Sequence, residues 1–189
     1  MVAAEAASGA EAVALARDAR PDVAIVDIGM PGLNGIEATA QILRRSPSTA
    51  VLILSMHSDE RYVVRALKAG ARGYVLKDSV ERELIQAIEA VHAGRTFFSP
   101  AVAKVLSGRD VVAPRSPEME DRYDLLTERE REIYQLLAEG KSNKEIASRL
   151  CLSLHTVETH RTRVMDKLGL HSAAELVLSA VRRGLVGLP

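Results

Sequence analysis

Three short apolar runs, each ending near a polar residue, constrain the fold of the first hundred residues more than any other feature. They are residues 22–28 (DVAIVDI), 50–55 (AVLILS) and 73–77 (GYVLK), and they are rich in β-branched side chains. Such runs are typical of strands buried in a parallel sheet. Helical patterns accompany them at residues 9–17, 35–45, 59–69 and 80–93. Strands that alternate with helices predict βαβ units and a doubly wound α/β sheet.

The ends of these three strands place an aspartate, a serine and a lysine at one edge of the predicted sheet. The residues are Asp27, Ser55 and Lys77. Because functional sites of open parallel sheets lie at the carboxyl ends of the strands, we expect the three side chains to converge in one pocket. A purely structural interpretation remains open, in which Asp27 caps a turn, Ser55 ends its strand and Lys77 is solvated.

The C-terminal third of the chain is predicted to be all-α. Thr127 and Glu130 form a capping-box pattern that opens a helix, and Gly140 follows its end. Ser142, Ser153 and Ser172 are placed as N-caps of three more helices. The tight turn at residues 151–153 between two short helices has the form of a helix-turn-helix.

A segment with two prolines and no apolar periodicity separates the two halves. We therefore predict a domain at residues 1–107, a linker at 108–124 and a second domain at 125–189. Within the second domain, residues 141–167 contain six basic and three acidic groups, which favours a phosphate-bearing partner.

The composition excludes several classes of protein. Lys and Arg number 25 and so do Asp and Glu, which argues against a uniformly basic nucleic-acid coat protein. The single cysteine, Cys151, rules out an intramolecular disulfide and a multi-thiolate zinc site, and we expect it to pack in its turn. No run approaches the length of a membrane span, and no export signal is visible. We expect a cytoplasmic protein without a membrane partner.

Residues 1–95 resemble the receiver domain of two-component response regulators of the NarL/FixJ (LuxR-type) family, which has a flavodoxin-like fold. The resemblance rests on PDVAIVDIGMPGLNGIE, ILSMHSD and GARGYVLKD. It implies that Asp27 accepts a phosphoryl group from a sensor histidine kinase, that Ser55 hydrogen-bonds the acyl phosphate, and that Lys77 pairs with it. An aspartate is a competent nucleophile for such transfer. Tyr74 is similar to the family's switch aromatic, or else it is a half-buried strand tyrosine.

The resemblance has one departure, at the start of the chain. Receivers begin with a strand that ends in an acidic pair holding Mg²⁺, followed by a helix, whereas residues 2–22 here look like the second strand and second helix. We therefore expect a receiver without its first strand and helix. Either the start codon is set too late, or this is a truncated receiver whose sheet is closed in some other way, such as by a partner chain. Mg²⁺ would retain Asp27 and the Gly29 carbonyl, which is a weak site.

The C-terminal domain resembles the four-helix DNA-binding domain of the LuxR and NarL type. The motifs TERE, GKSNKEIA and TVETH occur in that order. The resemblance implies base contacts from Glu158, Thr159 and Thr162 in the major groove. The positions expected near phosphates are Lys141, Asn143, Lys144, Thr156, His160, Arg161, Arg163 and Lys167. Each of these side chains could instead belong to a solvated helix face.

The function that these features predict is a transcription regulator that is controlled by phosphorylation at Asp27 and binds double-stranded DNA as a homodimer. The last helix carries an apolar stripe suited to dimerisation, formed by Ala174, Val177, Leu178 and Val181. An alternative keeps DNA binding but makes activity constitutive or dependent on a protein partner. An autonomous phosphoryl-transfer enzyme is disfavoured because the chain lacks a GxxxxGK[ST] loop.

Overall fold

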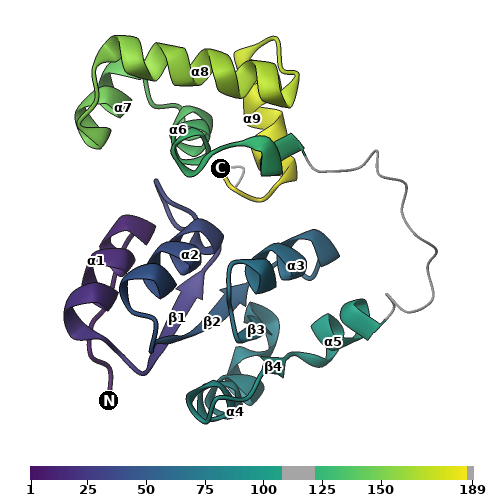
Figure 1. The fold of residues 1–189 in the computed structure, drawn as a ribbon. Helices are drawn as coiled ribbons and strands as arrows, with labels where there is room; N and C mark the ends of the chain where they lie inside the picture. Colours follow the sequence, from purple (N-terminus) through teal and green to yellow (C-terminus); the bar gives the residue numbers. More distant parts are fainter. Residues whose placement is uncertain (108–121, 187–189) are drawn as a thin grey trace. The chain divides into compact units, whose positions relative to one another are not determined.

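The computed structural model describes residues 1–107 and 122–186, which belong to two compact units (Figure 1). The units are Met1–Ala113 and Pro114–Pro189. Residues 108–121 of the predicted linker lie outside the described residues. None of the described helices combines the length and the apolar character that crossing a bilayer requires.

The first unit is built on a parallel sheet, as the sequence predicts. Its described strands are β1 (Val23–Asp27), β2 (Ala50–Ser55), β3 (Gly73–Leu76) and β4 (Phe97–Phe98), in the spatial order β1-β2-β3-β4. All three pairings are parallel. The two-residue strand β4 escaped the sequence analysis because so short an apolar run carries no period.

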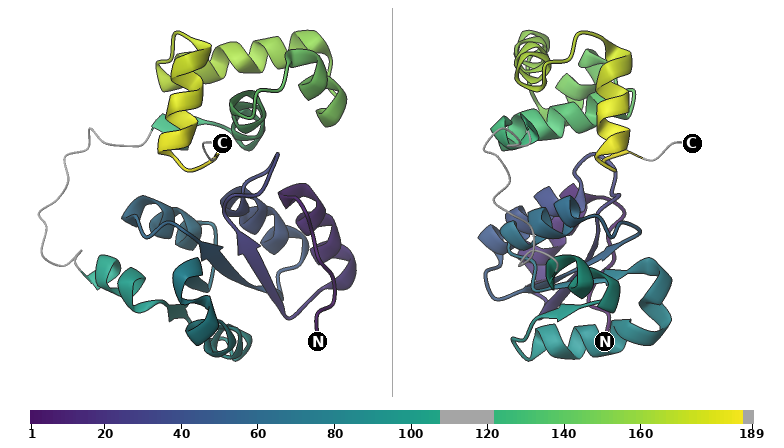
Figure 2. Two further views of the ribbon diagram at one scale, coloured as in Figure 1. Left: turned by 180° about the vertical axis from the view of Figure 1, so that it is seen from behind. Right: turned by 90° about the vertical axis from the view of Figure 1, so that its right-hand side faces the viewer.

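Helices cover both faces of this sheet (Figure 2). They are α1 (Gly9–Ala19), α2 (Gly35–Arg45), α3 (Glu60–Lys68), α4 (Val80–His92) and α5 (Pro100–Ser107). Ser8, Asn34 and Asp59 cap the first three by accepting backbone N–H bonds. One core contains Ile42, Ile53 and Val63, and a second, beneath α4, contains Leu52 and Val91. The predicted α/β class is confirmed.

The first residues do not form the strand that the sequence suggested. Residues 1–6 carry no regular secondary structure, and Val2 is 75% exposed. A strand requires a neighbour for its backbone hydrogen bonds, and the described residues offer none beside β1 on that side. Strand β1 is therefore an edge of the described sheet, and Ile25 on it is 45% exposed.

The second unit is helical, as predicted. It contains α6 (Glu128–Ala138), α7 (Asn143–Leu150), α8 (Leu154–Leu168) and α9 (Ala173–Arg182). Thr127, Ser142, Ser153 and Ser172 are their N-caps, and the first two form complete capping boxes. Ile133, Ile146 and Val157 join α6, α7 and α8 in one buried cluster, while Tyr134, Val164 and Leu176 join α6, α8 and α9 in another.

The start of the helical unit lies earlier than the sequence analysis placed it. Residues Arg122–Leu125 form a short 3-10 helix, η4, and Tyr123 within it is fully buried. Its ring meets the Tyr134 ring edge-on, with the centroids 5.9 Å apart. Residues 122–124, which were assigned to the linker, therefore belong to the packed helical unit.

Candidate functional site

The strand ends bring the predicted trio to one edge of the sheet in a staggered row. In the parallel register Asp27 is opposite Leu54, and Ser55 is opposite Leu76. Each functional residue thus lies one position beyond the partner of the previous one. Because the strands lie side by side, the three residues form a diagonal row along the carboxyl edge of the sheet.

An ion pair between Lys77 and Asp27 joins the two ends of this row. The Lys77 Nζ lies 2.6 Å from Asp27 Oδ2, and the side chains are 36% and 38% exposed. The other carboxylate oxygen, Oδ1, accepts the Gly29 N–H at 3.1 Å. The carboxylate is therefore oriented by two donors and accessible to a reagent from solvent, as a nucleophile must be.

Gly35 lets the backbone of α2 pack against the Asp27 carbonyl, a role that the sequence pattern did not predict. A Cβ at this position would lie 2.1 Å from the Asp27 carbonyl oxygen. Only glycine allows the first turn of α2 to approach the end of β1 so closely. The signal in the sequence was the Asn34-Gly35 pair, since Asn34 is the cap and Gly35 is the first residue of the helix.

Ser55 and Tyr74 form a buried polar pair next to this site. Ser55 is 1% exposed, and its hydroxyl oxygen accepts the His57 N–H at 3.0 Å. Tyr74 is fully buried rather than half-buried, and its hydroxyl donates to the His57 carbonyl at 2.6 Å. Burial raises the pKa of Tyr74 to about 12, and a hydrogen bond with Ser55 opposes this rise. Both side chains thus hold the backbone of the β2–α3 loop.

Replacing Tyr74 by phenylalanine is expected to remove an alkaline destabilisation of the first unit. An unfolded tyrosine ionises near pH 10 and the folded one near pH 12. The contribution of Tyr74 to the unfolding free energy is therefore fully present below about pH 10 and is lost as the pH rises to about 12. The loss is on the order of 2–3 kcal/mol. The unfolding free energy, measured by urea titration at rising pH, tests this. The same slope in Tyr74→Phe would contradict it.

The described residues of the first unit do not fit a resident Mg²⁺ site. Asp27 is a single carboxylate, and its two oxygens already accept bonds from Lys77 and Gly29. The parts of the chain that are described, 1–107 and 122–186, contain no group of three or more His, Cys, Asp or Glu residues placed to hold a metal ion. The resemblance to receiver domains implies Mg²⁺ at this site, but Asp27 and the Gly29 carbonyl alone are too few ligands for it.

The helix-turn-helix is formed by α7 and α8. Glu158 and Thr162 are exposed on α8, and Thr159 is half-buried beside them. The hydroxyls of Thr159 and Thr162 donate to the carbonyls of His155 and Glu158 one turn earlier. The exposed basic positions of the predicted set are Lys141, Lys144 and Arg163, while Asn143, Thr156, His160 and Arg161 are half-buried. Lys167 differs from these, because its ammonium is bonded within the domain.

The turn between α7 and α8 contains a strained residue, Cys151. Its backbone is left-handed, with φ 52° and ψ 46°, and its side chain is exposed, so the expectation that it packs in the turn is wrong. The left-handed conformation is what ends α7, because it lets the Cys151 N–H bond the Ala147 and Ser148 carbonyls.

Cys151→Gly is expected to stabilise the helical unit by about 0.5–1 kcal/mol. Glycine adopts a left-handed conformation without the Cβ clash, which outweighs the larger entropy of its unfolded state. The matched control is Ser148→Gly inside α7, where glycine should cost about 0.5–1 kcal/mol. Thermal unfolding of both variants gives the comparison. A destabilised Cys151→Gly would show that the turn depends on the thiol.

Taken together, the two units define a class of protein. An accessible aspartate paired with a lysine at the end of a parallel sheet, joined in one chain to a helix-turn-helix, is the organisation of a response regulator. The sequence matches the response regulator receiver domain over residues 1–89 and the luxR family of bacterial regulatory proteins over residues 124–180. This chain belongs to the LuxR-type response regulators, which are DNA-binding transcription regulators of two-component systems.

Similar proteins support this assignment along nearly the whole chain. The oxygen regulatory protein NreC of Staphylococcus epidermidis is 41% identical over 189 residues, covering 98% of this chain and 87% of the relative. The response regulator GacA of Pseudomonas aeruginosa is 37% identical, covering 94% and 82%.

Two solved structures are similar as well. A LuxR family response regulator from Aurantimonas has 42% identity and a TM-score of 0.56, covering 59% of this chain and 79% of that one. A structure of RcsB has 26% identity and a TM-score of 0.51, covering 93% and 83%.

Proposed function

We propose that Asp27 is the phosphoacceptor of this response regulator and takes a phosphoryl group from a sensor histidine kinase. The observation that carries the proposal is the 2.6 Å ion pair between Lys77 Nζ and Asp27 Oδ2 at the end of the sheet. In the transfer a carboxylate oxygen of Asp27 forms the new P–O bond while the P–N bond to the kinase imidazole breaks. The Lys77 ammonium then balances the charge of the acyl phosphate.

The β2–α3 loop is the proposed reporter of this state. Ser55 Oγ now accepts the His57 N–H, and the Tyr74 hydroxyl donates to the His57 carbonyl. If the Ser55 side chain rotates so that Oγ moves to an acyl phosphate on Asp27 and away from His57, the His57 N–H loses its acceptor and the loop must adjust. Tyr74 is the switch residue because its hydroxyl is bonded to that same loop.

Incubation of the chain with acetyl phosphate, followed by mass spectrometry, tests Asp27 as the acceptor. We expect one added phosphoryl group, absent from Asp27→Asn.

The second candidate function is a regulator that is not phosphorylated and acts constitutively or through a protein partner. The single carboxylate of the site favours this second function. It would be established if acetyl phosphate left Asp27 unlabelled and did not change DNA binding.

The proposed DNA interface is the exposed face of α8 with the N-terminal end of α7. Glu158, Thr159 and Thr162 are assigned to base edges, with Glu158 accepting from a cytosine amine. Support comes from the helix-turn-helix geometry and from the solved structure of RcsB, in which two dimers are bound to two parallel DNAs. Binding should weaken steeply with salt, because phosphate contacts release counterions.

Dimerisation on DNA is assigned to α9. Val177 and Leu178 are 36% and 54% exposed there, with Ala174 exposed and Val181 half-buried beside them. Val177→Glu is expected to weaken binding to paired half-sites about tenfold or more, because it places a carboxylate in an apolar contact. Binding to a single half-site should hardly change. Fluorescence anisotropy with both duplexes measures the difference, and equal losses would remove α9 from the interface.

A further inference from the structure

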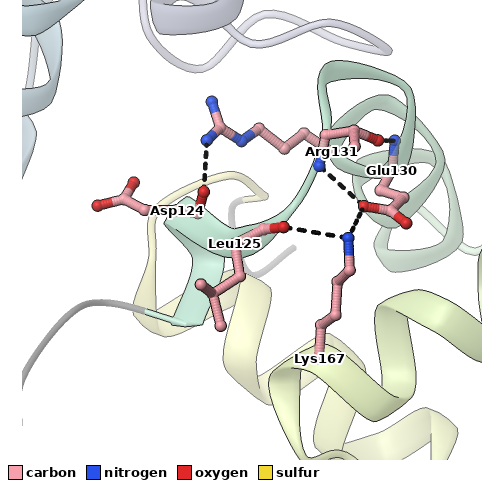
Figure 3. Close-up of polar contacts among 6 residues, drawn as sticks. Asp124, Leu125, Glu130, Arg131 and Lys167 are labelled. Atoms are coloured by element: carbon pink, nitrogen blue, oxygen red, sulfur yellow. Dashed lines mark hydrogen bonds and ion pairs between the residues drawn. The ribbon is translucent and has the colours of Figure 1, made fainter.

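Lys167 is directed into its own domain rather than toward solvent (Figure 3). It lies in the last turn of α8, and its Nζ donates to the Leu125 carbonyl at 3.1 Å and to Glu130 Oε2 at 2.7 Å. The Lys167 side chain is 34% exposed and that of Glu130 only 3%. Two of the three ammonium protons are thus committed to internal acceptors on η4 and α6.

Glu130 is a buried carboxylate that depends on this lysine. The same oxygen, Oε2, also accepts the Thr127 N–H at 2.8 Å and so closes the capping box of α6. Desolvation raises the pKa of Glu130, but the bonds from Lys167 and Thr127 outweigh it and hold the pKa below its usual value. Removing the lysine would leave a buried charge without its counter-ion, which is costly.

The short helix η4 contacts three helices of the unit at this point. Arg131 of α6 donates to the Asp124 carbonyl at 3.4 Å, as Figure 3 shows. The guanidinium carbons of Arg131 and Arg183 lie 5.2 and 5.4 Å from the Tyr123 ring centre. Arg122 reaches Gly169, the residue that ends α8, so closely that a Cβ there would lie 2.2 Å from Nη1. The short helix η4 at the start of the domain and the C-terminal end of α8 are therefore packed together.

We propose that Lys167 is a positioning residue and not a phosphate contact: with Glu130 and the Leu125 carbonyl, it fixes the C-terminal end of α8 to η4 and to the start of α6. This inference rests on the proposed binding of DNA through α8. An ammonium that moved out to a DNA phosphate would strip Glu130 of its partner, so we expect Lys167 to keep its two internal bonds when the domain is on DNA. The orientation of α8 in the groove then depends on η4.

A double-mutant cycle in the full chain separates the two roles of Lys167. The variants are Lys167→Met, Glu130→Gln and their combination, with binding to a short fluorescein-labelled duplex of arbitrary sequence followed at several salt concentrations. We expect each single change to weaken binding about tenfold, with little further loss in the double variant, because both break the same link. The slope of log K against log salt should stay that of the wild type in all three.

Arg163→Met, at an exposed position of α8, is the matched control. If Arg163 contacts a phosphate, its loss should make the negative slope of log K against log salt shallower by about 0.9. If Lys167→Met lowers the slope in the same way and Glu130→Gln strengthens binding, Lys167 contacts phosphate and the proposal is overturned. Absence of binding by the wild type at low salt would instead refute the proposed function, so the two failures are distinguishable.

Lys167→Arg keeps the test decisive if Lys167→Met does not fold. Arginine retains the charge beside Glu130 and binds phosphate at least as well as lysine, but its longer planar group does not reproduce both internal bonds. We expect Lys167→Arg to fold and to bind DNA more weakly than the wild type. Undiminished binding by this variant would mean that only the charge matters, which contradicts a positioning role.

Discussion

Replacing Tyr123 by alanine is expected to destabilise the helical unit by about 3–5 kcal/mol, as deletion of a buried aromatic ring does. Tyr123 is fully buried, its ring meets that of Tyr134, and two guanidinium groups lie on it. The cavity would open where η4, α6 and α9 meet. Hydrogen exchange of the α6 and α8 amides in the full chain measures the loss as faster exchange.

Leu125→Ala in the same short helix is the control. The Leu125 side chain is 53% exposed, and only its backbone carbonyl accepts Lys167. Its truncation should change the free energy of unfolding by less than about 0.5 kcal/mol. Equal effects of the two substitutions would mean that η4 is not part of the core. A large effect of Tyr123→Ala also implies that a DNA-binding fragment must begin at or before residue 122 rather than at 125.

The helical unit separates what a sequence can predict from what it cannot. Ser142 and Ser153 marked the starts of α7 and α8 correctly, because a cap is a local interaction between residues two or three apart. Tyr123 was missed because its burial depends on Tyr134 and Arg183, which are distant in sequence. The internal position of Lys167 was hidden for the same reason, since one of its acceptors is a backbone carbonyl 42 residues away.

The receiver unit gives a similar division. The strands β1, β2 and β3 were predicted because continuous apolar runs are the signal of strands in a helix-covered parallel sheet, although Ile25 on the edge strand β1 is 45% exposed. Residues 2–6 were misjudged, because a strand exists only with a neighbour and no sequence pattern supplies one. Asp27 and Lys77 could be placed at one edge from topology, but the 2.6 Å contact between them required the structure.

The chain as described is expected to be phosphorylated slowly, and completion of its metal site should accelerate the reaction. A strand and helix attached before residue 1, with two carboxylates at the end of the new strand, would pair with the free edge of β1 and bring ligands to Asp27. A divalent ion at a transferring phosphoryl group contributes several kcal/mol. We therefore expect labelling by acetyl phosphate to be about 100-fold faster in the extended chain, and only when Mg²⁺ is present.

Two controls separate the effect of the metal ligands from that of the completed sheet. An extended chain with both carboxylates replaced by amides restores the partner of β1 without the ligands, and we expect it to label as slowly as the original chain. Asp27→Asn in both chains should abolish labelling if Asp27 is the acceptor. If the original chain labels at Asp27 as fast as the extended one and with the same Mg²⁺ dependence, then Asp27 and the Gly29 carbonyl are sufficient ligands once the phosphoryl oxygens join them. A single carboxylate would then be enough for phosphorylation, and the site would no longer favour a regulator that works without it.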